Sequence, residues 1–123
     1  MAKKVQKILI GEDEKPMARA LELKLKSLGF EAKIAFNGEE VLQALQKEKF
    51  NLVLLDLMMP KVDGFSVLAK MQENKDKTPV IVASNLSQSE DLQKAKKLGA
   101  VDYFVKSDTP IAEVVVRVKK ALN

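Results

Sequence analysis

The chain has 123 residues, of which 46% are hydrophobic and 31% are charged, a balance that suits one globular domain spanning residues 1–123. It contains no cysteine and no histidine, which excludes disulfides, thiolate or imidazole metal sites and histidine-based catalysis. No apolar run approaches the roughly 20 residues of a membrane span, and the segment 1–11 fits a buried strand better than a signal peptide. We therefore expect a cytoplasmic protein that does not interact with membranes.

The net charge is +4, from 21 basic and 17 acidic residues, and only Arg19 and Arg117 are arginines. Proteins that read base edges or clamp phosphates favour arginine, whereas the lysines here are scattered along the chain. We interpret them mainly as solvated helix faces and expect no direct binding of nucleic acid.

The first half of the chain predicts alternating strands and helices. An apolar strand at Ile8–Ile10 precedes a helix that begins near Pro16 and ends at Gly29. The apolar stripe of this helix consists of Met17, Leu21, Leu25 and Leu28. A second strand at Ala32–Phe36 and a third at Leu52–Leu55 enclose another helix. Its apolar stripe consists of Val41, Leu42 and Leu45.

The second half continues the alternation. The next helix has an apolar stripe of Val67, Leu68 and Met71, and a strand at Val80–Ala83 follows it. Ser87–Glu90 has the spacing of a capping box, which predicts a helix that ends at Gly99. Its stripe consists of Leu92, Ala95 and Leu98. After a strand at Tyr103–Val105, the last helix begins at Pro110, and its stripe consists of Ile111, Val114, Val115, Val118 and Leu122.

Five β-α repeats with near-continuous apolar strands predict an α/β fold: a parallel sheet covered by helices on both faces, in three layers. No linker, low-complexity tract or second core interrupts the pattern. Open sheets of this doubly wound kind place their working residues at the carboxyl ends of the strands.

Polar residues follow the strands at that edge. Three acidic residues in a row, Glu12 to Glu14, come after the first strand, and Asp56 directly follows the third. Carboxylates brought this close repel one another, and a hard cation such as Mg²⁺ with oxygen ligands resolves the repulsion. The edge also receives Ser84 after the fourth strand and Lys106 after the fifth, which suit the binding of phosphoryl oxygens.

Each of these signals also has a plain structural interpretation. Glu12 to Glu14 could be a charged loop at a helix N-terminus. Lys106 could be a lysine whose stem lies on apolar surface, and Ser84 could be a turn hydroxyl. The combination of all four features in one chain order favours a functional site.

The motifs ILIGEDE, LVLLDLMMPKVDG, TPVIVAS and LGAVDYFVKS resemble those of response regulator receiver domains of the CheY-like type, over essentially the whole chain. DLMMPKVDG is the most specific of them. The resemblance implies a flavodoxin-like (βα)5 fold whose five parallel strands have the order 2-1-3-4-5. It further implies that Asp56 is the phosphoacceptor of a two-component phosphorelay.

The resemblance also implies roles for other residues. Glu12 and Asp13 would bind Mg²⁺ together with Asp56, and the backbone carbonyl of Met58 would complete the protein's share of the ligands. Ser84 and Lys106 would bind phosphoryl oxygens, and Tyr103 would be an aromatic switch that turns inward as Ser84 moves. The residues that would shape the neighbouring loops are Pro60, Gly64, Asn85 and Ser107.

The chain departs from the family pattern at four of these positions. Ser107 stands where a proline with a cis bond usually follows the lysine, and Asn85 stands where alanine or glycine is usual. We expect Asn85 to crowd the phosphoryl pocket or to alter the access of water. The first acid is Glu12 where aspartate is commoner, and Ser84 replaces threonine but keeps the hydroxyl.

The leading hypothesis is a phosphorylation-controlled switch and not an enzyme. A sensor histidine kinase or histidine phosphotransfer protein would supply the phosphoryl group, and an effector protein or a missing output domain would respond. The face formed by the fourth helix, the fifth strand and the fifth helix would be read out. Its expected exposed residues are Lys94, Lys97, Tyr103 and Lys119.

Three alternatives stay open at this point. The chain could be a receiver scaffold that binds partners without phosphorylation. A phosphohydrolase with Asp56 as nucleophile is less favoured, because Met58 stands where such enzymes carry a second aspartate. A flavin-binding module is least favoured, because the acidic loop Glu12 to Glu14 would repel the phosphate. The absence of linker residues after Leu122 favours a stand-alone receiver, and we expect a monomer or a weak dimer.

Overall fold

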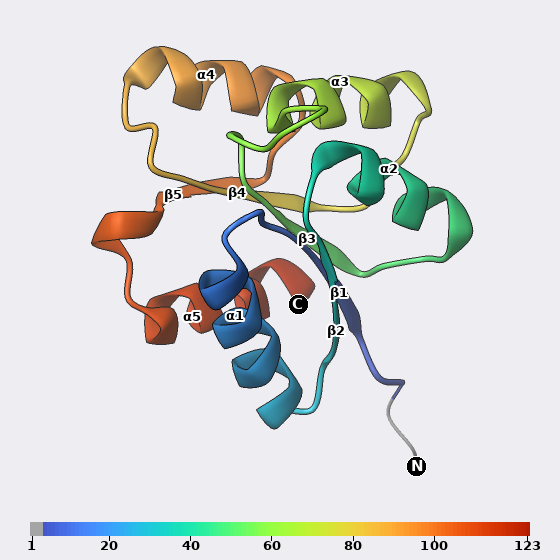
Figure 1. Ribbon diagram of the computed structural model, residues 1–123, viewed down its shortest axis with the longest axis vertical. Coiled ribbons are helices and arrows are strands. Elements are labelled where there is room, and N and C mark those ends of the chain that lie inside the picture. The colour runs from blue at the N-terminus through green and yellow to red at the C-terminus, as the bar shows by residue number, and fades with distance from the viewer. Residues whose placement is uncertain (1–3) are drawn as a thin grey trace.

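The computed structural model describes residues 4–123, so the first three residues of the predicted N-terminal strand segment lie outside it. All five strands are parallel and form one sheet in the order β2-β1-β3-β4-β5, which confirms the predicted fold (Figure 1). The strands are β1 (Lys7–Gly11), β2 (Glu31–Ala35), β3 (Leu52–Leu55), β4 (Val80–Ser84) and β5 (Asp102–Val105). The helices are α1 (Lys15–Ser27), α2 (Gly38–Lys47), α3 (Gly64–Glu73), α4 (Ser89–Lys97) and α5 (Ile111–Leu122), with a 3₁₀ turn, η1, at Lys106–Asp108.

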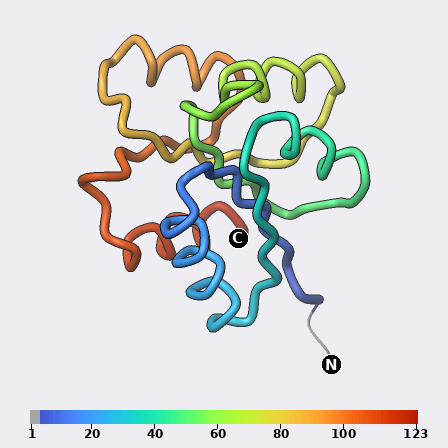
Figure 2. The backbone as a smooth tube through the Cα atoms, viewed as in Figure 1, coloured from blue at the N-terminus to red at the C-terminus, as the bar shows by residue number. Residues whose placement is uncertain are grey.

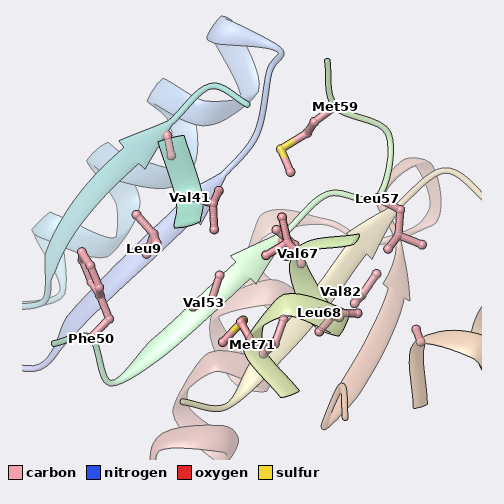
Figure 3. Close-up of a cluster of buried hydrophobic side chains, with 14 of the residues drawn as sticks. Leu9, Val41, Phe50, Val53, Leu57, Met59, Val67, Leu68, Met71 and Val82 are labelled. Atoms are coloured by element: carbon pink, nitrogen blue, oxygen red, sulfur yellow. The ribbon is translucent and has the colours of Figure 1, made fainter. Parts of the chain in front are cut away.

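Helices cover both faces of the sheet. The backbone path in Figure 2 shows α1 and α5 on one face and α2, α3 and α4 on the other. Each face buries its own apolar cluster, because successive residues of a strand point to opposite sides. Ile8 and Ile10 of β1 pack with α1 and α5, whereas Leu9 between them packs with the opposite helices. Figure 3 shows this second cluster, in which Val67 and Met71 of α3 lie over the sheet.

The strand register places the predicted site residues at one edge of the sheet. Gly11, the last residue of β1, pairs with Leu55, the last residue of β3. Ser84 at the end of β4 likewise pairs with Val105 at the end of β5. The residues that follow these four therefore lie together at the carboxyl edge, beside the position where the strand order reverses.

The predicted stripe of α1 is only partly buried. Leu21 and Leu25 are buried as expected, but Met17 and Leu28 are 36% and 39% exposed. The buried face is completed instead by Ala18, which stands three residues before Leu21 and so lies closer to the centre of that face. Ile111 of the α5 stripe lies on the same helix face as the buried Val115 and Val118, but it is 38% exposed because it is the first residue of the helix.

The expected capping box before α4 is wrong. The helix begins at Ser89 and its N-cap is Gln88, whose side chain makes no capping hydrogen bond, so Ser87 lies outside the cap position. Side-chain caps occur instead at Asn37, which accepts from Glu40 N, and at Asp63, which accepts from Ser66 N. The predicted C-terminal glycines are confirmed, since Gly29 and Gly99 adopt φ of 94° and 102°. Within residues 4–123, no helix has both the length and the apolar character needed to cross a bilayer.

Candidate functional site

The carboxyl edge of the sheet gathers the predicted site residues. Glu12 and Asp13 follow β1, Asp56 follows β3, Ser84 ends β4, and Lys106 follows β5. Glu12 and Asp56 are only 2% and 4% exposed, and Ser84 is fully buried. Burying two carboxylates side by side is costly unless a counter-charge compensates them.

Lys106 provides that counter-charge. Its Nζ donates to Glu12 Oε1 at 2.8 Å and to Asp56 Oδ2 at 3.0 Å, so one ammonium bridges residues that follow two different strands, β1 and β3. A third contact, to Glu14 Oε1 at 3.2 Å, was not predicted from the sequence. Glu14 is the N-cap of α1 but makes no side-chain cap, and its place in the run of three acids is the signal that could have indicated this contact.

Burial and ion pairing shift the pKa values of Glu12 and Lys106. Burial is the main reason that the pKa of Glu12 rises to about 7, and its hydrogen bond from Lys106 only partly offsets this effect. For Lys106, burial favours the neutral amine, but hydrogen bonds to Glu12 and Asp56 outweigh it and raise the pKa above its ordinary value. The lysine therefore stays charged, and the carboxylates remain incompletely neutralised.

The carboxylates are arranged to hold a cation. Glu12, Asp13 and Asp56 each offer an oxygen within 4.8 Å of the other two. An all-oxygen donor set of this charge fits a hard divalent cation rather than a thiophilic metal. The donor set therefore agrees with the expected cation site, at the same carboxylate that Lys106 contacts.

The backbone around Asp56 is held on both sides. Asp56 N donates to Gly11 O at 2.9 Å, and Asp56 Oδ1 accepts from Met58 N at 3.2 Å. Gly64 N donates to Leu57 O at 2.9 Å, and a Cβ added to Gly64 would lie 2.5 Å from Asp56 O. Only glycine allows this approach. The metal-binding role of the Met58 carbonyl stays a prediction, and the Met58 side chain itself is 61% exposed. Pro60 is exposed in the same loop.

Tyr103 is buried, so its expected place among the exposed read-out residues is wrong. Its hydroxyl donates to Leu86 O at 2.7 Å, and Leu86 N in turn donates to Ser84 Oγ at 3.2 Å. The ring thus packs inward because its hydroxyl finds a partner in the loop after β4. Burial also raises the pKa of Tyr103 above its ordinary value. The other residues expected on that face, Lys94, Lys97 and Lys119, are exposed.

The two loop residues that depart from the family pattern contact each other. Ser107 N donates to Asn85 Oδ1 at 3.0 Å. The Lys106–Ser107 peptide bond is trans, as are all peptide bonds of the described residues.

The parallel sheet and its acidic edge define the class: an α/β domain with a carboxylate site bridged by one lysine. The family model for the response regulator receiver domain matches residues 8–118, so the chain belongs to this family of two-component systems.

Comparison with curated proteins finds relatives described as transcriptional regulators. The chain is 39% identical over 118 residues to the probable transcriptional regulator ycf27 of Porphyridium aerugineum. The aligned region covers 96% of this chain and 48% of that protein. It is 35% identical to the transcriptional regulatory protein DltR of Streptococcus agalactiae, covering 94% of this chain and 53% of that protein. The chain therefore spans about half the length of these relatives.

Solved receiver domains share the fold closely. The Francisella response regulator 1452 receiver domain superposes with a TM-score of 0.90 at 31% identity, covering 95% of this chain and 96% of that one. The response regulator TrrA of Thermotoga maritima, solved in complex with Mg²⁺ and BeF, gives a TM-score of 0.85 at 30% identity and covers 96% of this chain and 100% of that one.

Proposed function

We propose that the chain is the phosphoacceptor switch of a two-component phosphorelay, with Asp56 as the acceptor. The observation that carries the proposal is the contact of Lys106 Nζ with Asp56 Oδ2 at 3.0 Å, beside two further carboxylates suited to a cation. The phosphoryl group would come from a sensor histidine kinase, a histidine phosphotransfer protein or a small phosphodonor.

In the proposed reaction, an Asp56 carboxylate oxygen attacks phosphorus in line with the leaving group. A new O–P bond forms as the bond to the leaving group breaks, and the leaving group departs with the electron pair. Lys106 moves its ammonium from the free carboxylate to the phosphoryl oxygens, and the Ser84 hydroxyl donates to another of them. Positioning and charge neutralisation are the main demands of this transfer.

The ion that best suits this site is Mg²⁺. Glu12, Asp13, Asp56 and the backbone carbonyl of Met58 would hold it. The ion would supply positive charge to the phosphoryl oxygens in the transition state. The solved Mg²⁺ complex of TrrA supports this assignment by analogy.

Phosphorylation would shift a two-state equilibrium. Ser84, drawn toward the phosphoryl group, would alter the loop whose Leu86 carbonyl accepts from the Tyr103 hydroxyl. That movement would change the face formed by α4, β5 and α5. An effector protein or an attached output domain would read the change, without direct contact between this domain and nucleic acid, and the domain would act as a monomer or weak dimer.

The domain would act as an acceptor rather than as an enzyme with turnover. Met58 offers no acid or base two residues after the acceptor, so hydrolysis of the acyl phosphate would be slow. The cytoplasmic location also remains a prediction.

Mass spectrometry of the intact protein tests the proposal. The chain is incubated with Mg²⁺ and acetyl phosphate, alongside Asp56→Asn and the control Asp108→Asn, an exposed carboxylate in η1. We expect one phosphoryl adduct on the wild type and on the control, and none on Asp56→Asn. Continuous release of phosphate at enzyme-like rates would favour a hydrolase, and absence of any adduct would favour a phosphorylation-independent scaffold.

A further inference from the structure

The Asn85 side chain forms a hydrogen bond between the segments that follow β4 and β5, just past the last paired residues of these strands. The main-chain register ends with Ser84 opposite Val105. One residue further, Asn85 Oδ1 accepts a hydrogen bond from Ser107 N at 3.0 Å. This bond joins the loop that follows Ser84, the last residue of β4, to the turn that begins at Lys106.

The loop after β5 needs such support. Lys106 begins the single 3₁₀ turn η1, whose closing main-chain bond, Thr109 N to Lys106 O, is long at 3.4 Å. Thr109 Oγ1 braces the turn from its far side by donating to Val105 O at 2.8 Å. Asn85 stabilises the turn from the connection that follows β4.

The hydrogen bond requires both departures from the usual family residues. Alanine or glycine at position 85 has no side-chain acceptor, and proline at position 107 has no N–H. Asn85 and Ser107 therefore form a matched pair. The distance between their atoms is that of an ordinary N–H···O bond.

We propose that Asn85 is a positioning residue that fixes the main chain of Ser107 and thereby holds Lys106 against Asp56. This inference rests on the proposed function, since Lys106 is the group that would neutralise the transferred phosphoryl. A lysine ammonium stands on a flexible four-carbon stem, so its aim depends on where its own backbone is held. Asn85 itself contacts none of Glu12, Asp13 and Asp56 through any hydrogen bond of the described residues.

Three measurements on Asn85→Ala test the proposal, with Gln88→Ala as control. Gln88 is exposed in the same connection, and its side chain makes no cap. We expect hydrogen exchange of the Ser107 amide, followed by NMR, to accelerate about fivefold in Asn85→Ala, the effect of losing one hydrogen bond of about 1 kcal/mol. We expect the maximal rate of phosphorylation by acetyl phosphate to fall by a similar factor, while the Kd for Mg²⁺ stays unchanged. Gln88→Ala should alter none of these quantities.

Substitutions at position 107 separate the N–H from the hydroxyl. Ser107→Ala keeps the N–H and should behave as wild type, whereas in Ser107→Pro the donor is absent and Asn85→Ala should cause no further loss of rate. If Ser107→Pro fails to fold, the exchange of the Ser107 amide in Asn85→Ala still decides the matter.

Unchanged exchange of the Ser107 amide in Asn85→Ala would overturn the proposal, even if the phosphorylation rate changed, because Asn85 would then act on the pocket directly. An equal loss of Mg²⁺ affinity would also overturn it and indicate general damage to the site. A wild type that accepts no phosphoryl group would refute the proposed function instead, and the amide exchange would separately report on the hydrogen bond.

Discussion

Lys106 is the residue on which the site depends. Its ammonium contacts two buried carboxylates and one exposed carboxylate, and its own side chain is only 7% exposed. A buried charge that loses its partner is far more costly than an exposed one. The lysine therefore stabilises the domain before any phosphoryl group arrives, and would then exchange one set of oxygens for another.

Replacing Lys106 with methionine should both destabilise the domain and slow phosphorylation. Glu12 and Asp56 would be left without their counter-charge, which we expect to lower the free energy of unfolding by about 3 kcal/mol in the absence of Mg²⁺. Urea denaturation measures this change, with the exposed Lys97→Met as control. Equal stability of Lys106→Met and wild type would show that the ammonium does not compensate the carboxylates.

At the scale of elements, two helix starts hold the loop between β3 and α3. Gly38 begins α2, and a Cβ there would lie 1.9 Å from the backbone oxygen of Val62. Gly64 begins α3, and a Cβ there would lie 2.5 Å from the backbone oxygen of Asp56. Both close approaches are to backbone, which cannot rotate away as a side chain can. The loop that follows the acceptor is thus fixed by the packing of two helices.

Gly64→Ala should therefore displace the acceptor loop. We expect a loss of about 1–3 kcal/mol in the free energy of unfolding, the usual range for overpacking, together with slower phosphorylation of Asp56. Ser66→Ala, an exposed position on the same helix, is the control for denaturation and rate. A Gly64→Ala protein as stable and as reactive as wild type would show that the loop adapts freely.

A group of ion pairs connects α2 with two strands at the opposite edge of the sheet. Glu48, which follows α2, pairs with Lys7 of β1 and with Lys33 of β2. Hydrogen bonds from Lys33 and Lys7 lower the pKa of Glu48 from its ordinary 4.5 to about 2. A lowered carboxyl pKa gives stability that is present above about pH 4.5 and is lost as the pH falls toward 2.

The variant Glu48→Gln should accordingly be less stable than wild type at pH 7. The difference between the two denaturation midpoints should shrink at pH 3, because the carboxyl of the unfolded chain is already protonated there while the native carboxyl is still mostly ionised. Glu73→Gln, which removes an exposed acid near Lys70, is the control at both values. A difference that stays constant from pH 7 to pH 3 would contradict the pairing.

Element types and order could be predicted from the sequence, but several contacts could not. Apolar runs and stripes locate all ten main elements, because burial on both faces of a parallel sheet leaves a strong pattern. Periodicity cannot set the rotation of a helix within one residue, which is why Ala18 rather than Met17 is central in α1. The contact of Asp102 with Arg117 at 2.8 Å joins residues 15 apart, with no local signal to indicate it.

The same limits apply to the site. Because parallel strands end at one edge, Glu12, Asp56 and Lys106 could be predicted to meet there. The inward position of Tyr103 could not be predicted, since alternation places its ring on one face of β5 but does not show that Leu86 offers a carbonyl to it. The bond between Asn85 and Ser107 depends on loop geometry that no pattern in the sequence encodes.

For the whole molecule, charge repulsion at the acidic edge links folding to cation binding. Glu12, Asp13 and Asp56 lie close together in the folded chain and far apart on average in the unfolded chain. A ligand that binds only the folded state stabilises it by mass action. The domain should therefore gain stability from Mg²⁺ even without phosphorylation.

We expect Mg²⁺ at 100 times its Kd to raise the free energy of unfolding by about 2.7 kcal/mol. Asp13→Asn should be more stable than wild type without Mg²⁺, because one repelling charge is gone, and should gain less when Mg²⁺ is added. Sodium chloride at matched ionic strength is the control in the same denaturation series. An equal gain from both salts would show that screening alone stabilises the domain.

The most direct test of Asp56 as the phosphoacceptor locates the phosphoryl group within the chain. After reaction with acetyl phosphate and Mg²⁺, borohydride converts an aspartyl phosphate to homoserine, and peptide mass spectrometry identifies the residue that has changed. We predict conversion at Asp56 alone, which is lost when Mg²⁺ is removed and reduced in Lys106→Met. Conversion at Asp13 or another carboxylate, or at none, would contradict this prediction.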